Sequence, residues 1–359
     1  MEIDYKLPVL IFISYFTLLI PALFWIISPQ LKRSFDQHST ETTILFVLTG
    51  VFTTITWIFV CKFMYLDYTI WSFSKGFHWD FSLNAISHWL HDVCLFEDVV
   101  REASTGAWSW LWTHQIATFE VIVWTTILTI EGWRRRIPHL WAYMLLCKAM
   151  GVSTAMGVFC VVMLSHPPIR RRPSLKLLGV LAFSITVGLI TVLITPYVST
   201  SSNFMTNLVV MHAVALLPLI GDYDEQPALT VYDGTPKFIT LLYCFIAGAN
   251  FSIYLQQWIK CFMTCTESKH ILCRLVSTYI DVFWEHPAQT VINLDNIGTS
   301  IMSVVWMWLY SQQEFKKRVP SWAWATILLT PVLTASVTLP IFLSAYECSR
   351  LTVKQKKHE

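Results

Sequence analysis

Nine apolar stretches, most of them about 20 residues long, follow one another along the 359-residue chain. A helix of about 20 residues, at about 1.5 Å per residue, spans the roughly 30 Å hydrocarbon core of a bilayer. The stretches lie at residues 8–28, 43–65, 114–133, 139–165, 177–197, 205–221, 237–259, 297–312 and 322–346. The sequence therefore predicts an all-α fold, a polytopic transmembrane helical bundle of eight or nine spans in a single integral membrane domain, 1–359.

Composition and charge support a membrane protein and exclude several partners. Only 13% of the residues are charged, against roughly 25% in soluble domains, so most of the surface is expected to face lipid. The formal net charge of +2 argues against a nucleic-acid partner. With nine alternating spans, twelve Lys and Arg residues fall on each side, which gives no orientation. The first apolar stretch follows polar residues and has no small-residue cleavage site, so it is predicted to be a span.

Cysteine spacing and sequence motifs predict that the protein needs no metal and no cofactor. The nine cysteines contain no CxxC pair and no Cys/His ligand spacing. The chain also has no NDxxD-type, GxSxG or HExxH motif and no glycine-rich phosphate loop. Metal-dependent ionisation of a diphosphate is therefore not expected. No pair of short, Gly- or Pro-broken spans points to an inverted-repeat transporter.

The segment Asp67 to His114 concentrates polar chemistry, with six tryptophans, four histidines and six acids. On a helical wheel, residues 86–103 form an amphipathic helix at the membrane interface, and most of its acids and histidines fall on a solvated face. Glu97 falls instead on the apolar arc. A carboxyl group there either reaches the edge or has a raised pKa, as a general acid requires. Asp92 and Asp98 flank it as further candidates.

Three more acids are predicted within or at the ends of spans. Glu120 lies inside the span 114–133, and Lys148 is its expected partner, in a functional site or in a structural ion pair. Glu131 precedes two arginines by three and four residues, so it is expected to form a salt bridge at the end of a helix. Asp295 is read as a helix N-cap or, with His286, as part of a polar site.

Other polar groups receive structural interpretations. His212 and Asn250 stand alone in apolar spans, where hydrogen bonding between helices is the usual role. The acidic stretch at residues 222–234 is interpreted as a solvated loop. The tryptophans, by contrast, receive a functional interpretation together with the acids. Aromatic rings around a cavity stabilise carbocations through their negative π faces. This combination suits an enzyme that protonates an epoxide or olefin on a prenyl chain and protects the resulting cation from water.

Three stretches, HWLHDVCLFEDVVREASTGAWSWLWTHQI, ILTIEGWRRRIPHLWAYMLL and HPAQTVINLDNI, resemble a known family. They are similar to the fungal membrane-bound terpene cyclases of the ascofuranone and macrophorin meroterpenoid type. An integral membrane protein of indole-diterpene clusters is similar in the same places. The resemblance implies proton-initiated cyclisation of the farnesyl or epoxyfarnesyl arm of a meroterpenoid precursor, without loss of diphosphate. It also implies a place in an intracellular membrane, expected to be the endoplasmic reticulum, alongside other enzymes of the same pathway.

These observations lead to a set of expected site residues. The catalytic candidates are Glu97, Asp92, Asp98 and Glu120 as the acid, with Asp295 and His286 to orient or recycle the proton. The candidates that contact the small-molecule prenylated substrate are Trp89, Trp108, Trp112 and Trp124 as an aromatic wall, with the matching pair His114 and Gln115.

Other functions stay open at this point. A transporter of a small hydrophobic metabolite would use Glu120, Lys148, His212 and Asn250 along a path. A non-catalytic scaffold for a biosynthetic cluster would need none of these acids. A sterol-isomerase-like enzyme would share the combination of acid and tryptophans and differ in substrate.

Overall fold

The computed structural model describes residues 3–78, 80–167, 173–221, 235–266, 270–315 and 319–355. Within these ranges every regular element is a helix. The predicted acidic loop at 222–234 lies outside the described residues. Four helices are long and apolar enough to cross a membrane, at Lys6–Gln37, Thr40–Ser74, Leu175–Val198 and Lys237–Cys265, and shorter apolar helices accompany them. The predicted all-helical, membrane-embedded character is thus confirmed.

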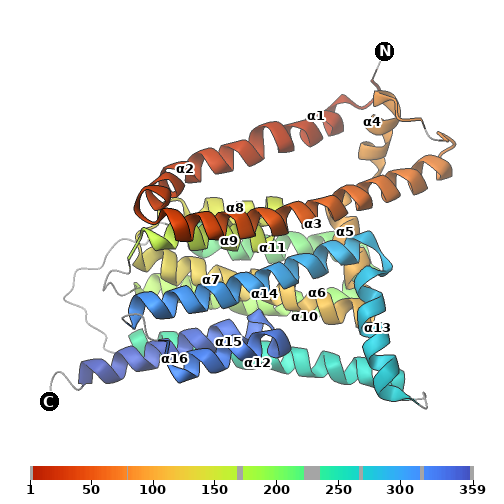
Figure 1. The fold of residues 1–359 in the computed structure, drawn as a ribbon. Helices are drawn as coiled ribbons and strands as arrows, with labels where there is room; N and C mark the ends of the chain where they lie inside the picture. Colours follow the sequence, from red (N-terminus) through yellow and green to blue (C-terminus); the bar gives the residue numbers. More distant parts are fainter. Residues whose placement is uncertain are drawn as a thin grey trace.

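Most long helices lie side by side with roughly parallel axes (Figure 1). They comprise α1 (Lys6–Ser14), η1 (Tyr15–Leu19), α2 (Ile20–Gln37), α3 (Ser39–Ser74), α10 (Leu175–Val198), α11 (Phe204–Ile220), α12 (Thr235–Cys265) and α14 (Pro287–Glu314). Three short helices, α4 (Leu83–Asp92), α5 (Leu95–Ser104) and α13 (Ile271–Glu285), run across one end of this bundle. We call it the α5 end, and the opposite end, which carries Arg135, the Arg135 end.

The central helix of the bundle contains two π-helical segments. It runs as α6 (Ala107–Thr118), η2 (Phe119–Trp124), α7 (Thr125–Ile127) and η3 (Leu128–Gly132), so the predicted span 114–133 begins several residues earlier than expected. A π-helical turn accommodates one extra residue and is frequently found at functional sites. Glu120 lies in the first such segment and Glu131 in the second.

The predicted span at 139–165 is wrong, because this stretch folds into a hairpin of two short helices. The helices α8 (Leu140–Met150) and α9 (Val152–Leu164) are separated by Gly151, whose φ of +99° and ψ of 159° are essentially restricted to glycine. Tyr143 and Phe159, eight residues before and after Gly151, have ring centroids 5.3 Å apart. Arg135, just before α8, donates a 2.8 Å hydrogen bond to the carbonyl of His166, just after α9. The segment therefore returns to the Arg135 end.

A second hairpin replaces the predicted span at 322–346. The helices α15 (Ser321–Leu333) and α16 (Ala335–Gln355) are separated by Thr334, which has a φ of +69°. The hydroxyls of Thr330 and Thr338, four residues before and after the break, are 2.8 Å apart. The chain thus contains two broken apolar helices, a feature that the sequence analysis did not detect.

The hairpin at 139–165 makes a testable prediction about sidedness. In a background without native cysteines, His139→Cys and Pro167→Cys are expected to react with a membrane-impermeant maleimide from the same side, because both lie at the Arg135 end. The control pair, Lys176→Cys and Thr200→Cys, is expected to react from opposite sides because α10 runs between them. Labelling of His139→Cys and Pro167→Cys from opposite sides would show that 139–165 crosses the membrane.

The predicted amphipathic helix at 86–103 is also interrupted. Val93, which is extended, and Cys94, which is also non-helical, separate α4 from α5. A single wheel over the whole segment therefore assigns wrong relative faces to residues before and after the break. The two ten-residue helices pack differently: Trp89 of α4 is buried against α3 residues Tyr68 and Trp71, whereas α5 contacts α6, α11 and α14.

Candidate active site

Asp98 is a half-buried carboxyl group in the first turn of α5. Its Oδ2 accepts a 3.1 Å hydrogen bond from the backbone N–H of Cys94, and within the described part of the chain it forms no salt bridge. Burial raises the pKa of Asp98 above its ordinary value, and the charges of Asp67 and Glu97 raise it further. A carboxyl group with a raised pKa keeps its proton at higher pH, as a general acid must.

The two neighbouring candidate acids have basic partners. Glu97 forms an ion pair with Arg101 one turn later, and Arg101 also donates to backbone carbonyls in the α10–α11 connection. Asp92 lies 3.1 Å from the ammonium of Lys75 and accepts a 3.1 Å bond from the indole N–H of Trp71. The Trp71 hydrogen bond, followed by that of Lys75, lowers the pKa of Asp92. Glu97 thus has a basic partner in place of the apolar surroundings that the sequence predicted, and the lowered pKa of Asp92 does not suit a general acid.

The four tryptophans of the expected aromatic wall lie in three different places. Trp89 donates a 2.7 Å hydrogen bond to Asp67 and packs edge-on against Tyr68 at 5.4 Å, close to the acids of α5. Trp108 and Trp112 face α12 and α13, where Trp112 stacks on Tyr279 at 4.4 Å. Trp124 is fully buried against Phe159 of α9. Of the four, Trp89 is therefore the ring associated with Asp98.

A charged triad lies deeper in the bundle, beneath α5. The ammonium of Lys148 forms an ion pair with Glu120, as predicted, and lies 3.2 Å from Nδ1 of His212. His212 therefore does bond between helices, and its ring contacts Phe96 of α5 at 5.3 Å. The Glu120 and Lys148 side chains retain 18% and 15% exposure, although both residues lie within the bundle. Part of each side chain is therefore accessible from outside the bundle.

Asp295 caps a helix, but not its own. It lies inside α14, and its carboxylate accepts hydrogen bonds from the N–H groups of Val152 and Ser153, both 2.9 Å, and from the Ser153 hydroxyl at 2.6 Å. These groups form the first turn of α9, where an anion is favoured. A side chain at Gly151 would meet the Asp295 carboxylate at 3.0 Å. Asp295 therefore holds the buried tip of the first hairpin.

The remaining predicted site residues have local partners. His286 caps α14 itself, since its Nδ1 accepts a 3.3 Å bond from the N–H of Ala288. Gln115 accepts a 2.8 Å bond from Asn296, which neighbours Asp295. His114 is buried with its Nδ1 bonded to the Trp110 carbonyl at 2.8 Å and its Nε2 without a partner. Asn250 donates a 2.7 Å bond to Ser336 O, next to the second hairpin's break. Gln115 thus lies near the tip of the first hairpin and Asn250 near that of the second.

A second buried charge cluster lies at the Arg135 end. Arg134 bridges Glu131, at 3.1 Å, and Glu347 of α16, and Arg135 lies 3.6 Å from Glu131. Tyr310 of α14 donates a 3.2 Å bond to Glu131. The predicted salt bridges of Glu131 are confirmed, but they are buried instead of lying at an exposed helix end.

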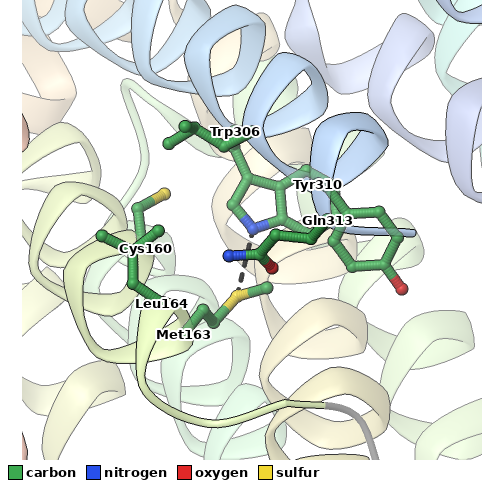
Figure 2. Close-up of a pocket in the computed structure, with 7 residues that line it drawn as sticks. Cys160, Met163, Leu164, Trp306, Tyr310 and Gln313 are labelled. Carbon is green, nitrogen blue, oxygen red and sulfur yellow. Dashed lines mark hydrogen bonds between the residues drawn. The ribbon is translucent and has the colours of Figure 1, made fainter. Parts of the chain in front are cut away.

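A small hollow, with about 10 Å³ of space for a water-sized sphere, adjoins this cluster. Figure 2 shows Trp306 and Tyr310 of α14 facing Cys160 and Met163 of α9, with the Trp306 indole N–H 3.0 Å from the Met163 sulfur. Leu164, Leu309 and Gln313 complete the lining. None of the predicted acids lines this hollow, which lies at the opposite end of the bundle from Asp98.

The sequence reasoning missed partners that are distant along the chain. Glu347 and Tyr310 are 213 and 179 residues from the groups that they bind. The signal that could have indicated the first hairpin is Gly151 at the middle of a 27-residue apolar stretch. Searches of protein-family models, curated proteins and solved structures found no significant match to this chain.

Proposed function

We propose that the protein is a membrane-embedded terpene cyclase that starts its reaction by protonating the farnesyl or epoxyfarnesyl arm of a meroterpenoid precursor. Asp98 is the proposed proton donor. The observation that supports this choice is the half-buried Asp98 carboxyl group, whose pKa is raised by burial and which lacks a basic partner among the described residues. Glu97, Asp92 and Glu120 are ion-paired, and Asp295 caps α9.

In the proposed reaction, the Asp98 proton passes to the epoxide oxygen or to an olefin carbon of the substrate. In the epoxide, one C–O bond breaks and its oxygen becomes a hydroxyl; in the olefin, the π electrons form the new C–H bond. The next double bond attacks the carbocation centre, so that a C–C bond forms at each ring closure. Loss of a proton from the last cation restores the proton count and leaves a product with the mass of the substrate. The Trp89 and Tyr68 rings, which pack against each other, are the proposed aromatic groups that stabilise the cation.

We further infer seven membrane crossings and two re-entrant hairpins from the described residues. The crossings are α1–α2, α3, α6–η3, α10, α11, α12 and α14, and the helices α4, α5 and α13 lie at the interface. The proposed location is the endoplasmic reticulum membrane, with other enzymes of the pathway as candidate partners. A prenylated substrate would reach α5 from the bilayer, since its arm is lipid-soluble.

The test is conversion of farnesylated and epoxyfarnesylated phenols by yeast microsomes that contain the protein. The expected product is an isomer of equal mass, absent from microsomes without the protein. Because the acid must be protonated in the free enzyme, kcat/KM is expected to fall as pH rises through the raised pKa of Asp98. Absence of any isomer from either substrate class, with the protein correctly inserted, would reject the proposal.

A transporter is the second candidate, because two hairpins enter the bundle from one end and the first has a charged triad beside its tip. Broken helices whose ends meet polar groups inside the membrane are typical of transporters. This candidate predicts flux of a hydrophobic metabolite in proteoliposomes with no change in its structure. Conversion to an isomer in the same proteoliposomes would favour the cyclase.

A further inference from the structure

The ammonium of Lys148 has an unused hydrogen-bond donor at a place that a ligand can reach. A lysine ammonium carries three N–H donors. Among the described residues, one is directed to Glu120 and one to Nδ1 of His212, 3.2 Å away. The third N–H group of Lys148 has no hydrogen-bond partner among the described residues. Because 15% of the Lys148 side chain remains exposed, a group from outside the bundle can approach this side chain.

His212 holds Lys148 in place and presents a second donor. Its Nδ1 accepts the Lys148 bond, because a lysine ammonium has no acceptor. A neutral imidazole in this state carries its proton on Nε2. The Nε2–H group has no hydrogen-bond partner among the described residues, and the ring packs against Phe96 at 5.3 Å. Two N–H donors are therefore available below α5.

The surrounding charges determine what kind of acceptor fits. Glu120 neutralises Lys148 within the ion pair. The Asp295 carboxylate is a further negative charge near this ion pair, close enough to interact electrostatically with Glu120 and with Cys147, the residue before Lys148. A ligand that brought a further negative charge, such as a diphosphate, would be repelled in a medium of low dielectric constant. A neutral hydroxyl or carbonyl oxygen would be accepted.

We propose that Lys148, oriented by Glu120 and His212, binds a neutral hydroxyl or carbonyl oxygen on the head group of a hydrophobic substrate. The inference rests on the proposed function for its substrate class, a prenylated arene that carries such an oxygen. Phe96 contacts His212 and lies two residues before Asp98 on α5. The oxygen at Lys148 would thus anchor the head group while the prenyl arm extends along α5. Lys148 acts here as a positioning residue.

The test measures equilibrium binding of two tritiated probes to the full-length protein in nanodiscs, 2-farnesylphenol and farnesylbenzene, which lacks the oxygen. Wild-type protein is expected to bind the phenol about tenfold or more tightly than the hydrocarbon, because a hydrogen bond to a charged donor is lost with the oxygen. The double variant Glu120→Gln/Lys148→Met, which leaves no buried charge unpaired, is expected to lose most of this preference, because only the uncharged N–H donor of His212 remains. Lys148→Arg, which keeps a charged donor, is expected to recover part of the preference.

The matched control is Asp92→Asn/Lys75→Met, which removes an exposed ion pair near the same end and should leave the preference unchanged. An equal affinity of wild-type protein for both probes, or a preference that survives in full in Glu120→Gln/Lys148→Met, would overturn the inference. If the protein forms a cyclised product but the variants at Lys148 keep the full preference for the phenol, the oxygen site is rejected and the cyclase is not. If the preference for the phenol depends on Lys148 but no cyclised isomer forms, the cyclase is rejected and the oxygen site is not.

Discussion

Replacing Asp98 by Asn is expected to lower kcat for cyclisation by about 10²- to 10⁴-fold, the usual contribution of a general acid. Asn has nearly the same shape as Asp and can keep the hydrogen bond from the Cys94 N–H, but it has no proton to donate to an epoxide or olefin. The measurement is the rate of isomer formation in nanodiscs at saturating substrate.

Asp92→Asn provides the matched control for this loss. Asp92 belongs to the same polar segment, and the Trp71 indole and Lys75 ammonium hold it as an exposed, ionised carboxylate. The variant is expected to retain most of the wild-type kcat. If Asp98→Asn retained it as well, or if Asp92→Asn lost as much, Asp98 would not be the donor.

Replacing Arg134 by Met is expected to destabilise the protein by about 3–5 kcal/mol, the usual cost of removing one partner from a buried ion pair. Arg134 is 5% exposed and binds both Glu131 and Glu347, which are 0% and 3% exposed. The variant would remove the Arg134 guanidinium from both carboxylates. The expected result is a large fall in the midpoint of thermal unfolding in detergent.

An exposed ion pair supplies the comparison for Arg134. The Lys75 and Asp92 side chains are 53% and 32% exposed, and such pairs contribute roughly 0–1 kcal/mol. Lys75→Met is therefore expected to shift the unfolding midpoint little. Adding Glu347→Gln to Arg134→Met should recover part of the lost stability, because one buried negative charge is removed. A midpoint for Arg134→Met equal to that of Lys75→Met would show that the cluster is not structurally important.

Hydropathy predicted where the chain is helical, but not where it turns back. The span predicted at 205–221 matches α11 within a residue, and that at 177–197 matches α10 within two residues. A single glycine inside 27 apolar residues does not reveal a reversal, because composition is the same whether the helix continues or folds back. The group that stabilises the reversal is Asp295, more than 140 residues away.

The sequence could predict contacts of the candidate site between residues on helices that are joined by one short turn. Glu120 and Lys148 lie on helices that meet at residues 133–139, and their depths could be matched from the rise of a helix alone. A single helical wheel over residues 86–103 favours Glu97 over Asp98, but the helix is broken at Val93 and Cys94, so the wheel does not hold beyond them. His212 could not be placed, because no local signal relates α11 to α8.

On the proposed topology, the two hairpins change the side of the bilayer to which the basic residues between 166 and 321 belong. Among the described residues, nine Lys and Arg residues lie nearest the Arg135 end and six lie nearest the α5 end, with Lys148 between them. Such an excess marks the cytosolic side of a membrane protein. On the proposed topology Asp98 therefore faces the lumen, so the proton that starts each turnover is drawn from that compartment, and acidifying the lumen should accelerate the enzyme.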